Sequence, residues 1–217
     1  MAEVAAPRGF EPLPRRWMKP AVFIISLLPF AWWGYRGLVG QLGANPIEAT
    51  TRYFGDWALR FLLIALAVTP VRLVSKWNGI ARLRRMLGLF AFFYVALHVM
   101  SYVGLDLFFD MSLLIQEILK RRYITVGMFA LVILIALAAT STDGMIRRLG
   151  GKRWRRLHSF VYPAAIAGVI HYYMMVRAGF IEPLTYGAIL AALFAVRIVK
   201  KAKVVSADMR SWPRSND

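Results

Sequence analysis

The 217-residue chain contains no cysteine. Iron–sulfur clusters, covalently attached c-type haem, thiolate-ligated haem and disulfides all require cysteine, so none of them can form within this chain. Histidine is nearly as scarce, with three residues, and acidic residues number 11 against 28 Lys and Arg. Any metal site must therefore use histidine, methionine or oxygen ligands.

Polar sequence is also sparse, because hydrophobic residues make up 59% of the chain and mean hydropathy is +0.54. This composition is too apolar for a soluble domain, and an apolar stretch of about 20 residues spans a bilayer as a helix. We predict an all-α, polytopic membrane bundle of six transmembrane helices, two of them short or interrupted. Their expected ranges are Pro20–Val39, Trp57–Val71, Met86–Phe109, Tyr123–Thr140, Phe160–Val176 and Pro183–Val199.

The distribution of charge predicts the orientation of this bundle. The N-terminal tail, the second and fourth loops and the C-terminal tail hold 21 Lys and Arg against five acids, whereas the other three connections, counted with Arg60 near the start of the second helix, hold seven against six. The positive-inside rule therefore places both termini in the cytoplasm. Because the basic residues flank helices, anionic lipid and topology account for the pI of 10.9, and we expect no nucleic-acid partner.

The six helices account for nearly the whole chain, which predicts one domain. We expect a cytoplasmic tail over 1–19, a six-helix transmembrane domain over 20–200 and a second cytoplasmic tail over 201–217. No internal repeat, dinucleotide-binding fingerprint or P-loop is visible, so a soluble electron donor would be a separate protein. The first apolar run is longer than a signal-peptide core and lacks a clear cleavage site, which favours an uncleaved anchor.

The third loop has a pattern of its own. Polar residues recur at helical spacing between Asp110 and Arg122, which predicts a short amphipathic helix on the outer surface with Asp110 as its N-cap. This helix could rest in the membrane interface or serve as a docking ledge for an extracytoplasmic partner.

Two of the three histidines are expected at a similar depth. His98 lies 12 residues after Met86, and His171 lies 14 residues after Leu157, which places them about 18 Å and about 21 Å along two outward-running helices. Two neutral imidazoles in the outer half of the membrane could clamp a haem b between them. The alternative is that each histidine only hydrogen-bonds a neighbouring carbonyl or tyrosine. Small neighbours that would admit a flat macrocycle are Ala91, Ala167 and Gly168.

His158 is expected at the cytoplasmic end. On one ideal helix its ring would point about 140° away from that of His171, although Pro163 between them could re-aim it. The third helix carries Arg84 and Arg85 at that depth instead of a second histidine, so a second bis-histidine haem is not supported. These residues could instead bind an anionic group such as a flavin phosphate or a haem propionate. Alternatively, His158 is an interfacial residue beside Trp154.

Arg60 lies about one turn inside the outer end of the second helix. Its guanidinium could pair with haem propionates or extend to the lipid headgroups. Two other functions compete with electron transfer, namely a histidine-relay proton or ion transporter and a non-catalytic assembly subunit. The acids that a transporter would need all lie near helix ends: Asp56, Asp106, Asp110, Glu117 and Glu182.

Several short motifs together resemble a known family. They are Arg84-Arg85-Met86-Leu87-Gly88-Leu89, Leu97-His98, Tyr123-Ile124-Thr125-Val126-Gly127, Thr140-Ser141-Thr142, Arg147-Arg148-Leu149-Gly150, Trp154-Arg155-Arg156-Leu157-His158 and His171-Tyr172. In order and spacing they are similar to the MsrQ (YedZ) family, the haem-binding membrane subunits of the bacterial periplasmic protein-methionine-sulfoxide reductase system. That family belongs to the ferric-reductase-like transmembrane superfamily, and the similarity covers roughly residues 15–200.

The resemblance implies a function in the bacterial inner membrane. Electrons would pass from a cytoplasmic NAD(P)H-dependent flavin reductase, or from quinol, through flavin (FMN) and haem b. Their acceptor would be a periplasmic molybdopterin enzyme that reduces methionine sulfoxide in damaged proteins. His98, His158 and His171 would be the haem-associated histidines. Related NADPH oxidases carry two haems and four histidines, so three histidines favour one haem with a flavin in the inner position. A ferric or quinone reductase is the alternative within this superfamily.

Overall fold

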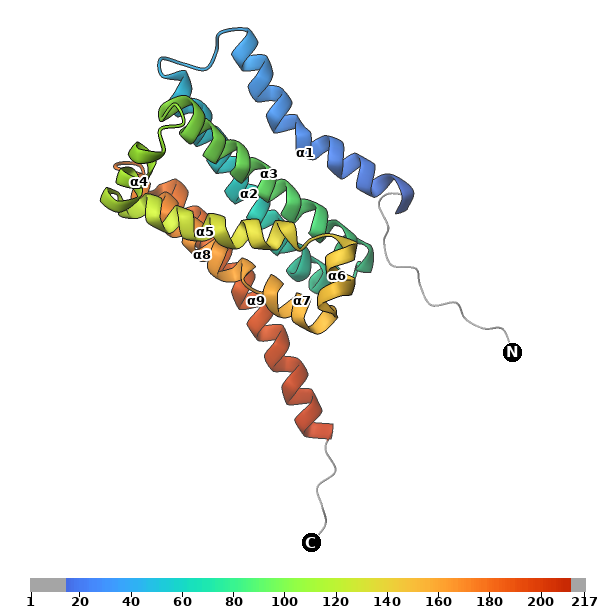
Figure 1. The fold of residues 1–217 in the computed structure, drawn as a ribbon. Coiled ribbons are helices and arrows are strands. Elements are labelled where there is room, and N and C mark those ends of the chain that lie inside the picture. Colours follow the sequence, from blue (N-terminus) through green and yellow to red (C-terminus); the bar gives the residue numbers. More distant parts are fainter. Residues whose placement is uncertain (1–14, 212–217) are drawn as a thin grey trace.

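A computed structural model describes residues 15–211, with side chains over residues 16–200. The regular secondary structure of these described residues is helical, with no strand among them (Figure 1), which confirms the predicted all-α class. The elements are α1 (Arg15–Leu38), α2 (Pro46–Ser75), the 3₁₀ helix η1 (Asn78–Leu83), α3 (Arg84–Ser101), the π-helix η2 (Tyr102–Asp106), α4 (Met111–Lys120), α5 (Arg122–Ala139), α6 (Asp143–Leu149), α7 (Gly151–His158), α8 (Val161–Met175) and α9 (Ile181–Ser211).

Five helical segments of the described chain are long and apolar enough to cross a membrane. They are Arg16–Leu38, Pro46–Ser75, Asn78–Asp106, Arg122–Ala139 and Ile181–Lys200. The sixth predicted span corresponds to α8, which has 15 residues and is about 22 Å long at the helical rise. This length is below the roughly 30 Å of a hydrocarbon core, so length and composition support five spans directly.

The second helix is longer than its apolar window predicted. Instead of Trp57–Val71, α2 covers 30 residues from Pro46 to Ser75. Its start is defined by Asn45, whose side chain accepts a hydrogen bond from the backbone N–H of Glu48 at 3.2 Å, and by proline at the first helical position. Polar residues in the first three turns of α2 lower the hydropathy there, so the predicted range began too late.

The predicted continuous helix through His158 is wrong. The chain ends α7 at His158, turns through Ser159 and Phe160, and begins α8 at Val161. Pro163 therefore lies in the first turn of α8, where its missing N–H removes no intrahelical bond. The expected angle of about 140° between His158 and His171 assumed one ideal helix and does not apply.

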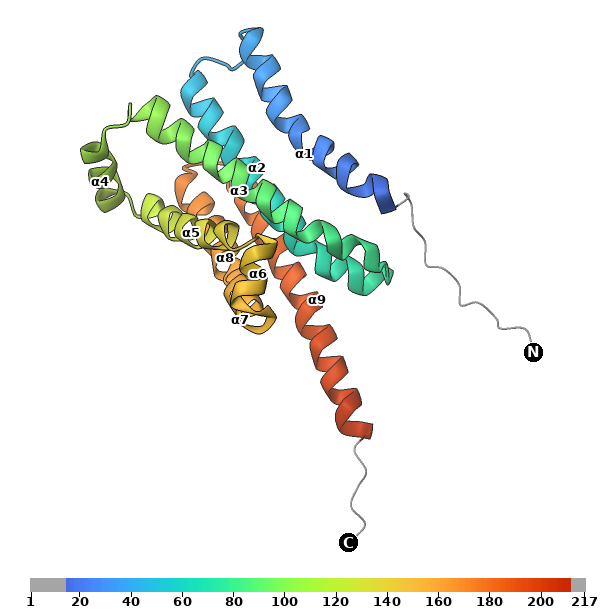
Figure 2. The same ribbon diagram turned by 45° about the vertical axis from the view of Figure 1, so that its right-hand side comes forward.

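The centre of the molecule is built from two helix pairs, α2 with α3 and α5 with α8 (Figures 1 and 2). Aromatic side chains fill the first pair. The rings of Phe61 and Tyr94 stack with centroids 5.1 Å apart and an interplanar angle of 5°, and Tyr94 is fully buried. These pairs bring α2, α3, α5 and α8 together around the histidines described below.

Helix α1 lies beside this core and is attached to it by polar contacts (Figure 2). The Tyr94 hydroxyl donates to the carbonyl of Ser26 at 2.7 Å, and the Tyr53 hydroxyl donates to the carbonyl of Pro29 at 2.8 Å. Both acceptors are backbone groups of α1, so two tyrosines from different helices fix its position.

The short helices occupy opposite ends of the bundle. Helix α4 lies near the α1–α2 connection, whereas α6 and α7 lie at the other end, toward the start of α1 and the end of α9 (Figures 1 and 2). The Asp110 carboxylate accepts a hydrogen bond from the backbone N–H of Leu113 at 3.0 Å. This contact confirms the predicted N-cap and the short helix after it.

Candidate functional site

His98 on α3 and His171 on α8 face each other across the bundle. Their ring centroids are 6.2 Å apart and their planes stand at 81°. The sequence predicted a similar depth for these two residues, and the structure brings their rings together.

Each of these imidazoles is anchored through its Nδ1 atom to a neighbouring helix. His98 Nδ1 lies 2.8 Å from the carbonyl oxygen of Thr51 on α2, and His171 Nδ1 lies 2.7 Å from the carbonyl oxygen of Tyr123 on α5. A carbonyl oxygen can only accept, so Nδ1 carries the proton in both rings. Each neutral ring therefore keeps an unprotonated Nε2 with a lone pair, the form that binds metals.

The separation of the two rings matches the spacing of two imidazoles bound to one metal ion. A metal–imidazole bond of about 2 Å, plus about 1.1 Å from nitrogen to ring centre, puts two opposed ring centres about 6 Å apart. The observed centroid distance is 6.2 Å. Hydrogen bonding to a carbonyl, the alternative role considered for these histidines, is also present, but it occupies only Nδ1.

The donor set at this site consists of two histidines. Within residues 16–200, no group of three or more His, Asp and Glu side chains is arranged to hold a metal ion. A bare divalent cation in a protein usually takes four or more protein or water ligands. Two opposed imidazoles instead suit a metal that arrives with its own equatorial ligands, as iron does in a porphyrin.

A small polar network surrounds His98. The Ser101 hydroxyl donates to Thr51 Oγ1 at 3.0 Å and is also 2.8 Å from the His98 carbonyl oxygen. The π-helix η2 begins directly after Ser101, and π segments occur often at functional sites. Thr51 and Ser101 could not be identified from the sequence, because Thr51 contributes its backbone carbonyl and both look like ordinary polar residues in a helix.

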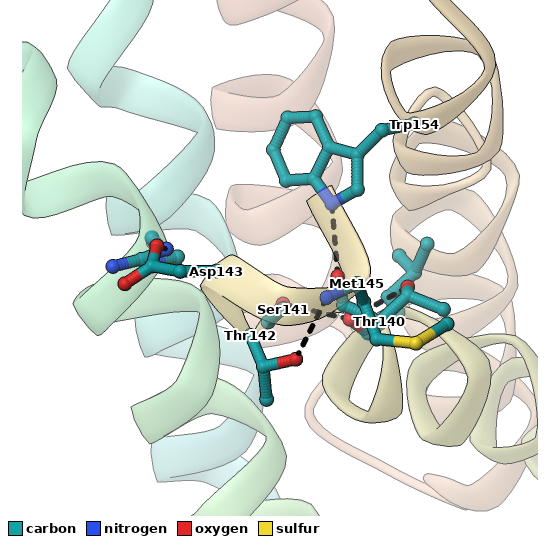
Figure 3. Close-up of polar contacts among 8 residues, drawn as sticks. Thr140, Ser141, Thr142, Asp143, Met145 and Trp154 are labelled. Carbon is teal, nitrogen blue, oxygen red and sulfur yellow. Dashed lines mark hydrogen bonds and ion pairs between the residues drawn. The ribbon is translucent and has the colours of Figure 1, made fainter. Parts of the chain in front are cut away.

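His158 lies in a different environment, at the end of the bundle that carries α6 and α7. Its ring stacks on Trp154 with centroids 3.9 Å apart, and its Nε2 lies 3.2 Å from Thr140 Oγ1. Trp154 Nε1 donates to the Thr140 carbonyl at 2.9 Å (Figure 3). Burial lowers the pKa of His158, and the charge of Arg84 lowers it further. The predicted neighbourhood of Trp154 is confirmed.

The two arginines predicted beside His158 have different surroundings. Arg85 forms an ion pair with Asp143, the first residue of α6, and this contact lowers the pKa of the Asp143 carboxyl. Thr142 caps the same helix by accepting from the Met145 N–H at 3.2 Å (Figure 3). Arg85 is therefore partly neutralised, and an anion at this end would meet mainly Arg84 and His158.

The predicted position of Arg60, one turn inside the end of the second helix, is wrong: α2 begins at Pro46, so Arg60 is the fifteenth of its 30 residues and lies near its middle. Arg60 contributes to the contact between α2 and α9. Its Nε donates to the Tyr186 hydroxyl at 2.8 Å, and its guanidinium carbon lies 5.0 Å from the centre of the Trp57 ring. The side chain is thus directed along the protein surface toward α9 by a hydrogen bond and a cation–π contact.

Known proteins resemble this chain over most of its length. Residues 54–169, just over half of the chain, match the family described as "Ferric reductase like transmembrane component". A protein from Rhodospirillum rubrum is 59% identical over 179 residues, which cover 82% of this chain and 86% of that protein. It is named "Protein-methionine-sulfoxide reductase heme-binding subunit MsrQ". The chain belongs to the MsrQ family.

Other MsrQ proteins match over a similar range. The relative from Herminiimonas arsenicoxydans is 50% identical over 194 residues, covering 87% of this chain and 88% of its own length. The relative from Caulobacter vibrioides is 44% identical over 203 residues, covering 89% of this chain and 97% of its own length. Their shared name describes these relatives as heme-binding subunits, and the expected family membership is confirmed.

Proposed function

We propose that this protein is a membrane electron-transfer subunit in which His98 and His171 are the axial ligands of one haem b. The observation that carries the proposal is the pair of Nε2 lone pairs on rings 6.2 Å apart, each ring fixed through Nδ1 to a helix carbonyl. The name of the relatives, which describes a heme-binding subunit, supports the same cofactor.

The chemistry of such a site follows from its ligands. Haem b, when bound, supplies a one-electron couple at its iron. If His98 and His171 both hold the iron, oxygen would find no free coordination position there, which would favour electron transfer over oxygen chemistry. The carbonyls of Thr51 and Tyr123 hold the two rings in the metal-binding tautomer, so both residues are already oriented for the haem that they would hold.

The remaining predicted site residues have secondary roles in this proposal. Arg60 lies near the middle of α2, and binding of a haem propionate would require its side chain to turn away from Tyr186. Arg84 and Arg85 lie with His158 at the opposite end, where Arg84 would supply most of the positive charge for the phosphate of a flavin such as FMN, because Arg85 is paired with Asp143. His158 has no histidine partner among residues 16–200, which supports one haem rather than two.

We further propose a six-span topology with both termini in the cytoplasm of a bacterial inner membrane. Five spans are supported by length and composition, and α8 would be the sixth, short span, accommodated by local thinning of the bilayer. Two basic segments, the loop that follows α2 and the connection between α5 and α8, then lie on the cytoplasmic side. The domain limits 1–19, 20–200 and 201–217 follow from this topology, although α9 continues as a helix to Ser211.

The proposed direction of electron flow is from the cytoplasm outward. A cytoplasmic NAD(P)H-dependent flavin reductase, or quinol, would be the donor at the basic end. A periplasmic molybdopterin methionine-sulfoxide reductase would be the acceptor, for repair of oxidised proteins. The relatives are named as subunits of a protein-methionine-sulfoxide reductase, which supports this acceptor.

Anaerobic mixing of the reduced protein with candidate acceptors tests this function. The protein is reduced with dithionite, desalted and mixed with the periplasmic reductase subunit and a methionine-sulfoxide peptide while the b-type absorption is followed. We expect rapid reoxidation, with no reoxidation when the sulfoxide is omitted.

Fe(III) reduction is the second candidate function, because residues 54–169 match the ferric-reductase-like family. The same mixing experiment with an Fe(III) chelate separates the two. Reoxidation by the chelate but not by the reductase and sulfoxide would contradict the proposed acceptor and establish a ferric reductase.

A further inference from the structure

Each of the two facing histidines lies against a glycine of the neighbouring helix. A Cβ atom added to Gly55 on α2 would lie 3.0 Å from His98 Nδ1 and 3.2 Å from its Cε1. A Cβ atom added to Gly127 on α5 would lie 2.8 Å from His171 Nδ1 and 3.0 Å from its Cε1. Both imidazoles therefore occupy the space that any other residue's side chain would fill.

The position of these glycines relative to the acceptor carbonyls is the same in both helices. Gly55 follows Thr51 by four residues, and Gly127 follows Tyr123 by four residues. Residues four apart are stacked on one face of an α-helix, and each Cβ tilts toward the N-terminus, over the preceding turn. A side chain at the fourth position would therefore stand next to the carbonyl that accepts from the imidazole.

The same local unit thus occurs twice in the chain. In each copy, one helix (α2 or α5) supplies the acceptor carbonyl and a glycine one turn later. The helix packed against it (α3 or α8) supplies the histidine. The histidine follows the acceptor by 47 residues in the first copy and by 48 in the second. The acceptors are backbone carbonyls of two different residue types, Thr51 and Tyr123, so this part of the unit leaves no shared residue in the sequence.

We propose that Gly55 and Gly127 are positioning residues that give each axial imidazole access to its helix carbonyl. This inference rests on the proposed haem ligation. The Nδ1–H bond to a carbonyl fixes the tautomer and ring orientation, and it makes Nε2 more basic. A more basic ligand stabilises ferric over ferrous iron, so the glycines help to set a low reduction potential.

Alanine substitutions test this role. In Gly55→Ala and Gly127→Ala the new methyl group must displace the ring, because Cβ contacts of 3.0 Å and 2.8 Å are too close. We expect the midpoint potential of the bound haem to shift to a more positive value, more in Gly127→Ala. The ferric electron paramagnetic resonance spectrum should change as well, because it depends on the 81° angle between the two imidazole planes.

Gly88→Ala is the matched control. Gly88 lies on α3, the helix of His98, and a Cβ atom there would meet nothing within 4 Å. Alanine is a better helix former than glycine, so this substitution should preserve or increase thermal stability. Its midpoint potential and ferric spectrum should equal those of the unmodified protein.

If an alanine variant fails to retain haem, its midpoint potential cannot be measured. Nitrogen-15 NMR of haem-free protein labelled at histidine then shows which ring nitrogen carries the proton. With three histidines in the chain, their ring nitrogens can be assigned by substitution. We expect Nδ1-protonated rings at His98 and His171, and a loss of that single tautomer at the affected histidine in each variant. Unchanged potentials and ferric spectra, or an unchanged tautomer in haem-free variants, would overturn the inference. Failure of the unmodified protein to bind haem would instead contradict the proposed function.

Discussion

At the residue scale, the three histidines differ in which ring nitrogen forms a hydrogen bond within the protein. His98 and His171 bond through Nδ1 to carbonyl oxygens, which leaves Nε2 available in both. His158 uses Nε2, which lies beside the Thr140 hydroxyl, and its ring is covered by Trp154. This difference separates the two histidines that we propose as metal ligands from a histidine embedded in a structural contact at the other end of the bundle.

The environment of His158 predicts an effect of pH on stability. Burial and the charge of Arg84 lower its pKa in the folded protein below the ordinary value of 6.5. The unfolded chain therefore binds this proton more readily, and the contribution to stability is present above pH 6.5 and lost as pH falls through the lower, folded-state pKa.

Thermal unfolding of the protein and of His158→Gln measures this contribution. We expect the melting temperature of the unmodified protein to fall more between pH 7.5 and pH 5.5 than that of the variant, since glutamine does not titrate. An equal fall in both proteins would show that His158 is not the group responsible.

At the element scale, α1 is held to the core by hydroxyl groups that reach its backbone. Tyr94 is the most buried of these donors, and its ring stacks on Phe61. Replacement by phenylalanine keeps the ring and removes only the hydroxyl, so the loss of the bond to the Ser26 carbonyl can be measured in isolation.

Tyr94→Phe should destabilise the protein by about 1 kcal/mol, the usual net value of one hydrogen bond within a protein or a membrane bundle. Equilibrium unfolding in mixed detergent micelles measures this difference. Tyr173→Phe, at an exposed position on α8, is the control and should be neutral. A neutral result for Tyr94→Phe would indicate that the hydroxyl is equally well satisfied without α1.

The elements also show where sequence patterns lose their predictive power. The hydropathy pattern located the helices but placed the start of α2 eleven residues too late, because Arg52 and Asp56 interrupt the apolar run. The apolar window at Phe160 located the start of α8 within one residue, but the depth count treated α7 and α8 as one helix, since no glycine separates them and Pro163 marks the first turn of α8 rather than the break. Hydropathy averages over a window, whereas helix ends depend on individual caps and turns.

At the scale of the whole molecule, the basic residues and the helix directions support one orientation. The loop from α2 to α3 and the loop from α5 to α8 lie at the end of the bundle where α1 starts and α9 ends (Figure 1). These loops carry the excess of Lys and Arg that the positive-inside rule assigns to the cytoplasm.

Chemical labelling of single introduced cysteines tests this topology. The chain contains no cysteine of its own, so only the introduced residue can react. We expect Ala178→Cys, between α8 and α9, to react with a membrane-impermeant maleimide in spheroplasts. Ser159→Cys, between α7 and α8, should react only in inside-out vesicles. Labelling of both positions from the same side would show that α8 does not span the membrane.

The pairing of His98 with His171 was predictable, because residue spacing determines how far along its helix each side chain lies. Counting residues along two helices gives depth, and depth was enough to pair His98 with His171. The partners of their Nδ1 atoms were not predictable, because a backbone carbonyl leaves no mark in the sequence and Gly55 and Gly127 look like ordinary small residues of apolar helices. Interactions made by the backbone require the relative placement of helices, which residue spacing alone does not supply.

The most direct test of the account is the reduced-minus-oxidised absorption spectrum of three alanine variants made in haem-replete cells. We predict a b-type spectrum with one haem per chain for the unmodified protein and for His158→Ala. His98→Ala and His171→Ala should each lose it. An unmodified protein without haem, or either of the last two variants with an unchanged spectrum and haem content, would contradict the assignment of these two imidazoles as the ligands of one iron.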